Sequence, residues 1–230
     1  MTKIVILVAT VFALTMQPQA SAQQALQEKF AMVKQGVAQN QAALRQYVWT
    51  EETNILLNGE VKKTTYNRCQ YGPDGAVQKT LINSSSPPAE KRGVRGRVVE
   101  RKKEELGDYM QQASALVKQY VPPNPEQMES AFRAGGASLG QPGPGTLQLQ
   151  FKNYVKPGDS LVFTFNTAAK ALIRIEVNTY MSDQKDAVKL QVNFQTLPGG
   201  PNYVAQTVLD APAKKIQVQT TSSSYQRLGP

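Results

Sequence analysis

Histidine, the side chain most often used as a general base and as a metal ligand, is absent from all 230 positions of this sequence. Its absence excludes Ser-His-Asp and Cys-His catalysis, together with every metal site that requires an imidazole ligand. The chain has one cysteine, Cys69, which follows Arg68. A neighbouring cation can lower the pKa of a thiol, but without a histidine or a second cysteine we expect a buried and idle thiol.

Carboxylate pairs are the remaining candidates for acid–base chemistry, because glycoside hydrolysis needs only two suitably spaced acids. Glu51 and Glu52 are adjacent in a predicted strand, so their side chains point to opposite faces and cannot cooperate. Asp183 and Asp186 flank a turn, but two ligands fall short of the roughly six to eight oxygens that calcium takes. We therefore expect a protein that is not an enzyme and has no catalytic residue, metal site or cofactor.

The most unusual segment is a basic run between Glu90 and Glu105, which holds seven lysine and arginine residues. Near an anionic surface each basic residue contributes about 1 kcal/mol, so the run is suited to phosphate-bearing lipid or a membrane face. The alternative is a solvated helix start, in which Arg101 and Glu105 form an ordinary i,i+4 pair. The hypothesis of contact with an anionic surface rests on four arginines: Arg92, Arg95, Arg97 and Arg101.

The first 22 residues have the pattern of a secretory signal peptide. Met1-Thr2-Lys3 is a basic start, residues 4–16 form an apolar run, and Ala20-Ser21-Ala22 fits a cleavage site. The alternative is a membrane anchor, but the apolar run would cover only about 20 Å of the roughly 30 Å hydrocarbon core of a bilayer. We expect cleavage after Ala22 and a periplasmic or secreted protein.

The charge balance is basic, with 26 lysine and arginine residues against 17 aspartate and glutamate residues, a formal net charge of +9. For an exported chain we expect no nucleic-acid partner. The acidic surfaces available to it are lipid head groups, lipopolysaccharide and wall polymers. No oligomeric state follows from these patterns.

An amphipathic helix is predicted over residues 23–46, because apolar residues recur there at spacings of three and four. The next segment, 47–82, is rich in β-branched and aromatic residues and contains Asn58-Gly59. An Asn-Gly pair between two such runs is a strong hairpin signal, because both turn positions need a positive φ. With a second turn at Pro73-Asp74-Gly75, the segment is predicted to be a three-stranded antiparallel meander.

The middle of the chain, residues 97–134, is predicted to be an insertion of two helices. Pro122-Pro123 ends the first helix, and Asn124-Pro125 provides an N-cap followed by proline at the first position of the second helix. Residues 137–145 are rich in glycine and proline, so they are predicted to form a loop.

Over residues 146–225 apolar and polar residues alternate almost without interruption. Such alternation predicts antiparallel strands with one buried face and one solvated face. We therefore expect a single α+β domain over residues 23–230. In it a strongly curved antiparallel sheet, an open or half barrel, covers the N-terminal helix and the inserted helical pair.

The order of these elements resembles the LolA/LppX-type periplasmic lipoprotein carriers. The similarity covers most of the mature chain and rests on two hairpin segments, residues 58–62 (Asn-Gly-Glu-Val-Lys) and 71–75 (Tyr-Gly-Pro-Asp-Gly), and on the last two predicted strands, around residues 208–218. The resemblance implies an apolar cavity that shields the acyl chains of a lipid or an acylated protein.

A helix packed against the concave face of a curved sheet leaves a cleft lined with aliphatic side chains, a common kind of site for apolar ligands. The first hypothesis is thus an exported, non-catalytic binding protein for lipid or lipoprotein acyl chains. The second is a cell-envelope structural or interaction module whose basic face binds an anionic partner or membrane surface. The residues assigned to the cleft are Trp49, Phe151, Phe163, Phe165, Ile175, Leu190 and Phe194.

Overall fold

The computed structural model describes residues 40–86 and 94–229, and in the helix that begins at Val94 it describes side chains from Arg101 onward. The chain divides into two compact units, Met1–Ala42 and Ala43–Pro230. Residues 40–42 of the first unit are helical, as are residues 43 and 44 of the second, and residues 45 and 46 form a turn. The predicted signal peptide and most of the helix predicted over residues 23–46 lie outside the described residues.

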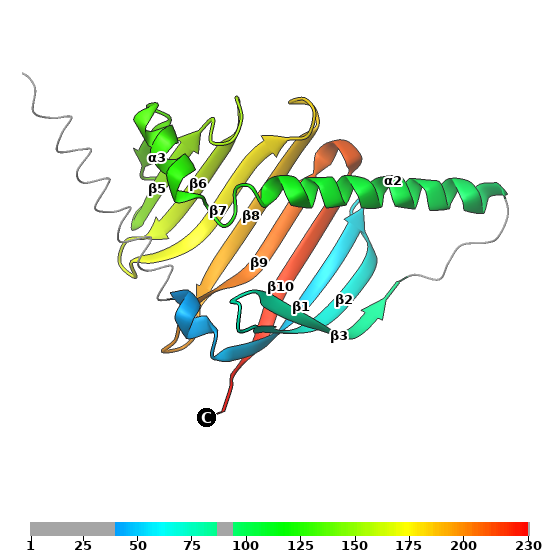
Figure 1. Ribbon diagram of the computed structural model, residues 1–230, viewed down its shortest axis with the longest axis horizontal. Coiled ribbons are helices and arrows are strands. Elements are labelled where there is room, and N and C mark those ends of the chain that lie inside the picture. The colour runs from blue at the N-terminus through cyan, green and yellow to red at the C-terminus, as the bar shows by residue number, and fades with distance from the viewer. Residues whose placement is uncertain (1–39, 87–93, 230) are drawn as a thin grey trace, which may run out of the picture. The chain divides into compact units, whose positions relative to one another are not determined.

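The second unit contains one open antiparallel sheet of ten strands, in the order β3-β2-β1-β10-β9-β8-β7-β6-β5-β4 (Figure 1). It consists of two meanders, and the pairing of β1 with β10 joins them. The fold is therefore α+β with an open sheet, as the sequence predicts. The strands are β1 (Tyr47–Leu57), β2 (Glu60–Tyr71), β3 (Val77–Ser85), β4 (Ala137–Gly140), β5 (Thr146–Lys152), β6 (Ser160–Asn166), β7 (Ala171–Tyr180), β8 (Ala187–Thr196), β9 (Asn202–Ala211) and β10 (Ile216–Arg227).

The predicted meander over residues 47–82 and the predicted strand run over residues 146–225 are both confirmed. Asn58 and Gly59 adopt φ angles of 55° and 81°, as a two-residue hairpin with both positions at positive φ requires. The loop predicted over residues 137–145 is wrong in its first part, because β4 pairs with β5 along its whole length. This short strand forms through backbone hydrogen bonds to its neighbour, and the glycine and proline residues that follow it make the whole segment resemble a loop.

The insertion between β3 and β4 carries the chain from one edge of the sheet to the other. It contains α2 (Val94–Val117) and α3 (Pro125–Arg133), close to the insertion predicted over residues 97–134. Nine spacings of about 4.8 Å make the sheet about 43 Å wide, and the 24 residues of α2 span about 36 Å. The helix accordingly runs across the strands and not along them (Figure 1).

The start of α3 forms as the sequence predicts. The Asn124 side chain accepts hydrogen bonds from the backbone N–H groups of Glu126 and Gln127 at 2.8 and 3.3 Å, and Pro125 is the first helical residue. Met128 and Ala131 form the buried face of this helix. In residues 40–86 and 94–229, no helix combines the length and the apolar character needed to cross a bilayer.

The pairing register places side chains in rows, and one face of the sheet carries an apolar row that crosses seven strands. We call this side the apolar face. The row consists of Phe151, Leu161, Val177, Leu190, Leu209, Val218 and Ile55. On the other side, which we call the polar face, the corresponding positions include the row Gln148, Thr164, Arg174, Asn193 and Gln206.

Candidate functional site

Beside the first row, the apolar face has a second row whose character changes from β5 to β2. This row begins with hydrocarbon side chains on β5 to β8 and continues with threonines on β9, β10, β1 and β2. Its members are Leu149, Phe163, Ile175, Val192, Thr207, Thr220, Thr53 and Thr65. The hydroxyl oxygens of Thr53 and Thr220 lie 3.3 Å apart and share a hydrogen bond. The second row thus changes from hydrocarbon to hydroxyl groups, while the first row remains apolar as far as β1.

One end of the apolar face remains partly accessible. Leu147, Phe165 and Leu172 pair in register on β5, β6 and β7, and all three side chains are half-buried. Phe163, one row further along, is 3% exposed, and its ring centroid lies 6.4 Å from that of Phe165. Phe163 in turn meets the fully buried Phe151 edge to face at 6.1 Å. The aromatic contacts therefore continue from the packed interior to an accessible strip, Leu147, Phe165 and Leu172.

The structure brings most of the predicted cleft residues together on β5 to β8, but it places Trp49 elsewhere. The Trp49 ring stacks on Tyr225 with centroids 5.4 Å apart, and it lies 5.4 Å from the ring of Tyr71. Four strands separate β1 from β6, so Trp49 is about 24 Å from Phe163 across the sheet. The predicted residues that share one neighbourhood are Phe151, Phe163, Phe165, Ile175 and Leu190.

Near Trp49, a carboxylate and a thiol are held in structural roles. Glu51 is 8% exposed and forms an ion pair with Lys79. Glu52 accepts a hydrogen bond from the Asn54 amide at 2.8 Å, so the two adjacent glutamates have separate partners. Cys69 is fully buried, and burial, assisted by Glu51, raises its pKa to about 11. The thiol stays protonated at neutral pH, which disfavours a nucleophilic role.

Asp183 and Asp186, considered as calcium ligands, both hydrogen-bond within the protein. Asp183 accepts a hydrogen bond from the backbone N–H of Lys185 at 2.7 Å. Asp186 accepts one from the hydroxyl of Tyr109, which comes from α2, also at 2.7 Å. Throughout residues 40–86 and 94–229, no three acidic or cysteine side chains gather as a metal site would require. The β7–β8 turn instead holds α2 in place.

Asp159 is an important residue that the sequence patterns did not single out. Its carboxylate is 2% exposed and accepts hydrogen bonds from the backbone N–H groups of Tyr154, Val155 and Lys156 at 2.6 to 3.0 Å. It also accepts one from the hydroxyl of Tyr120, just after α2, at 2.5 Å. Asp159 therefore fixes the β5–β6 loop and ties the end of α2 to it. The only signal in the sequence was a Pro-Gly-Asp turn, which does not reveal burial.

The basic run is described only in part. Arg92 lies outside the described residues, as do the side chains of Arg95 and Arg97 in the first turns of α2. Arg101 is exposed, and its Nε lies 3.3 Å from the carboxylate of Glu105, as the sequence predicts. The described part of the run is thus a solvated helix surface with an ordinary ion pair.

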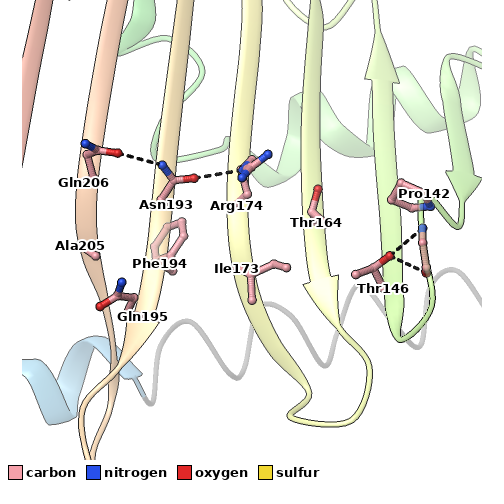
Figure 2. A pocket seen from close by; sticks show the side chains of 11 residues that line it. Pro142, Thr146, Thr164, Ile173, Arg174, Asn193, Phe194, Gln195, Ala205 and Gln206 are labelled. Atoms are coloured by element: carbon pink, nitrogen blue, oxygen red, sulfur yellow. Dashed lines mark hydrogen bonds between the residues drawn. The ribbon is translucent and has the colours of Figure 1, made fainter.

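A shallow, open depression of about 600 Å³ lies on the polar face, where two strand pairs are both irregular. Ile173 on β7 has no pairing partner on β6, and Ala205 on β9 has none on β8. Such β-bulges re-aim side chains and are frequent beside functional sites. Figure 2 shows the lining, which includes Phe194, a residue that the sequence assigned to the apolar cleft.

A chain of side-chain hydrogen bonds crosses the floor of this depression (Figure 2). Arg174 on β7 donates from Nε to the amide oxygen of Asn193 on β8 at 3.0 Å. Asn193 donates from Nδ2 to the amide oxygen of Gln206 on β9 at 3.3 Å. Gln191 also donates to Asn193 Oδ1, at 3.1 Å. The chain holds the guanidinium of Arg174 against the sheet.

No protein-family model and no curated protein matches this chain. Among solved structures, the chain is similar to the crystal structure of a DUF1329 family protein from Desulfovibrio piger ATCC 29098. The match has a TM-score of 0.41 and 12% sequence identity, and it covers 84% of this chain and 90% of that chain.

Proposed function

We propose that this protein is an exported, non-catalytic binding protein that holds the acyl chains of a lipid or a lipoprotein on the apolar face of its sheet. The observation that carries the proposal is the half-buried strip of Leu147, Phe165 and Leu172 beside a packed apolar layer. An acyl chain lying on this strip would gain about 25 cal/mol for each Å² of apolar surface removed from water.

The threonine side of the apolar face supports an amphipathic ligand. Thr207 and Thr220 continue the buried row of Phe163 and its neighbours onto the next two strands, and both threonine side chains are half-buried. Their hydroxyl groups are able to donate to and accept from a polar head group. A ligand with an apolar tail and a polar end therefore suits this face better than a plain hydrocarbon.

Two features of the sequence agree with this proposal. The predicted signal peptide would deliver the chain to the periplasm or the exterior, where membrane lipids and lipoproteins are available as ligands. The element order resembles that of the LolA/LppX-type carriers, in which a cavity shields acyl chains. We therefore include in the proposal a LolA-like carrier role and a ligand cleft around Phe163.

The test combines lipid analysis with a matched pair of variants. Protein purified from its host should retain lipid that native mass spectrometry and solvent extraction detect. Phe165→Gln should weaken the binding of a fluorescent fatty acid by about tenfold, because it removes an accessible aromatic side chain worth about 1.5–3 kcal/mol when buried. Gln150→Thr, on the polar face of β5, should leave the affinity unchanged.

Lipid-free protein from the host, together with equal fatty-acid binding by both variants, would refute acyl-chain binding. A second candidate would then remain, an envelope interaction module that uses the basic run. The exposed side chain of Arg101 favours it. In that case the protein should still sediment with anionic phospholipid vesicles while carrying no lipid of its own.

A further inference from the structure

We propose that the depression on the polar face is a second binding site, which takes a carboxylate carried on a hydroxyl-rich scaffold such as a uronic-acid saccharide. The site lies on the opposite side of the sheet from the accessible apolar strip, so it stands independently of acyl-chain binding. Its volume of about 600 Å³ falls within the range of about 300–1,000 Å³ that small-molecule sites occupy.

Arg174 supplies the group that would hold the carboxylate. Its Nε is fixed by Asn193, while its two Nη groups have no hydrogen-bond or ion-pair partner within residues 40–86 and 94–229. A planar guanidinium presents its remaining donors in a fixed fork, which matches the two oxygens of a carboxylate. The lining contains no acidic residue, and the nearest carboxylate along β7 on this face, Glu176, lies outside it.

The two bulges create the concave surface around this arginine. Thr164, Arg174, Asn193 and Gln206 form one row across β6 to β9, and a bulge follows the row on each side of the β7–β8 pair. Each bulge adds one residue to a strand and increases the local twist. Arg174 lines the resulting depression and remains exposed to solvent.

The surroundings of Arg174 fit a sugar ring better than a bare inorganic anion. Thr164 and Gln206 contribute a hydroxyl and an amide to the lining, and both groups donate and accept hydrogen bonds. Ile173 and Phe194 contribute apolar surface to the same lining (Figure 2). A pyranose presents hydroxyl groups at its rim and C–H groups on its faces, so it uses both kinds of contact.

The test is a calorimetric titration of the full chain with three probes: the trimer of galacturonic acid, the neutral glucose trimer maltotriose, and inorganic phosphate. We expect the galacturonic acid trimer to bind at least about tenfold more tightly than the other two. Arg174→Gln should weaken binding of this trimer by about 10- to 100-fold, the loss expected when hydrogen bonds to a charged group are removed.

Lys189→Gln is the matched control, because it removes the same charge from an exposed position of β8 on the polar face, outside the lining. It should leave the affinity within about twofold. An equal loss in both variants, phosphate binding as tight as that of the trimer, or no binding of the trimer would each overturn the proposal. Fatty-acid binding by Arg174→Gln should equal that of the unaltered protein, which separates the outcomes for the two sites.

Discussion

At the scale of single residues, Cys69 shows how strongly this fold suppresses reactivity. The thiol is fully buried between β1 and β3, with the nearly buried Glu51 close by. Burial comes first and the negative charge of Glu51 second among the causes that raise its pKa to about 11. Both effects oppose formation of the thiolate and outweigh the charge of Lys79, which acts in the opposite direction.

We expect native Cys69 to react with iodoacetamide at pH 8 at least about tenfold more slowly than the same protein in urea, because the attacking thiolate is buried and disfavoured. Mass spectrometry of quenched samples measures the rate. The raised pKa also means that the contribution of Cys69 to stability is complete below about pH 9 and declines as the pH rises toward 11. Equal labelling of native and unfolded protein would show that the thiol is accessible.

At the scale of elements, α2 depends on side-chain contacts near its C-terminal end. Tyr109 donates to Asp186, with Lys214 5.3 Å above its ring, and Tyr120 donates to Asp159. The side chains from Arg101 to Glu105, nearer its N-terminal end, are all exposed. Among the side chains described, from Arg101 onward, the contacts that anchor the helix to the turns after β5, β7 and β9 therefore lie in its second half and just after it.

Asp159→Asn should lower the free energy of unfolding by about 3 kcal/mol. The buried Asp159 carboxylate only accepts hydrogen bonds, and the NH₂ group of an asparagine would replace one of its accepting oxygens with a donor. Urea denaturation measures the change. Hydrogen exchange should also become faster in the second half of α2, which loses the anchor at Tyr120. Asp183→Asn is the control, and it should change the unfolding free energy by less than about 0.5 kcal/mol because its carboxylate is exposed.

At the scale of the whole sheet, buried and half-buried tyrosines lie at distant points of the structure. Burial raises the pKa values of Tyr109 in α2, of Tyr120 just after α2, and of Tyr225 beside Trp49. Hydrogen bonds to Asp186 and Asp159 raise the first two further. Each of these groups loses its proton more readily in the unfolded chain than in the folded one.

The folded protein should therefore lose stability as the pH rises above about 10, where unfolded tyrosines ionise and these three do not. We expect the melting temperature to fall steadily between pH 9.5 and 11.5 in calorimetric scans. Tyr225→Phe should make this fall in melting temperature shallower. At pH 7 the difference in melting temperature between the variant and the unaltered protein should be the same in different buffers. If the melting temperatures of the two proteins fell equally steeply with pH above pH 10, this account would be wrong.

Local patterns in the sequence predict the strands, the Asn58-Gly59 hairpin and the Asn124 cap, because each depends on a few adjacent residues. Register does not follow from such patterns. Strand order separates Trp49 from Phe163, and register places Thr53 in line with Phe163 on one face. The two bulges, the β4 strand and the burial of Asp159 likewise arise from contacts between segments that are distant in sequence.

The pairing of β1 with β10 has a consequence for how the chain is made. Gln46 and Arg227, whose side chains hydrogen-bond at this seam, lie 181 positions apart. A ribosome that adds roughly 5–20 residues per second needs about 10 to 35 seconds to travel between them. During that interval the first meander has no permanent neighbour on one flank, so the nascent polypeptide is most vulnerable to misassembly before its last strand is synthesised.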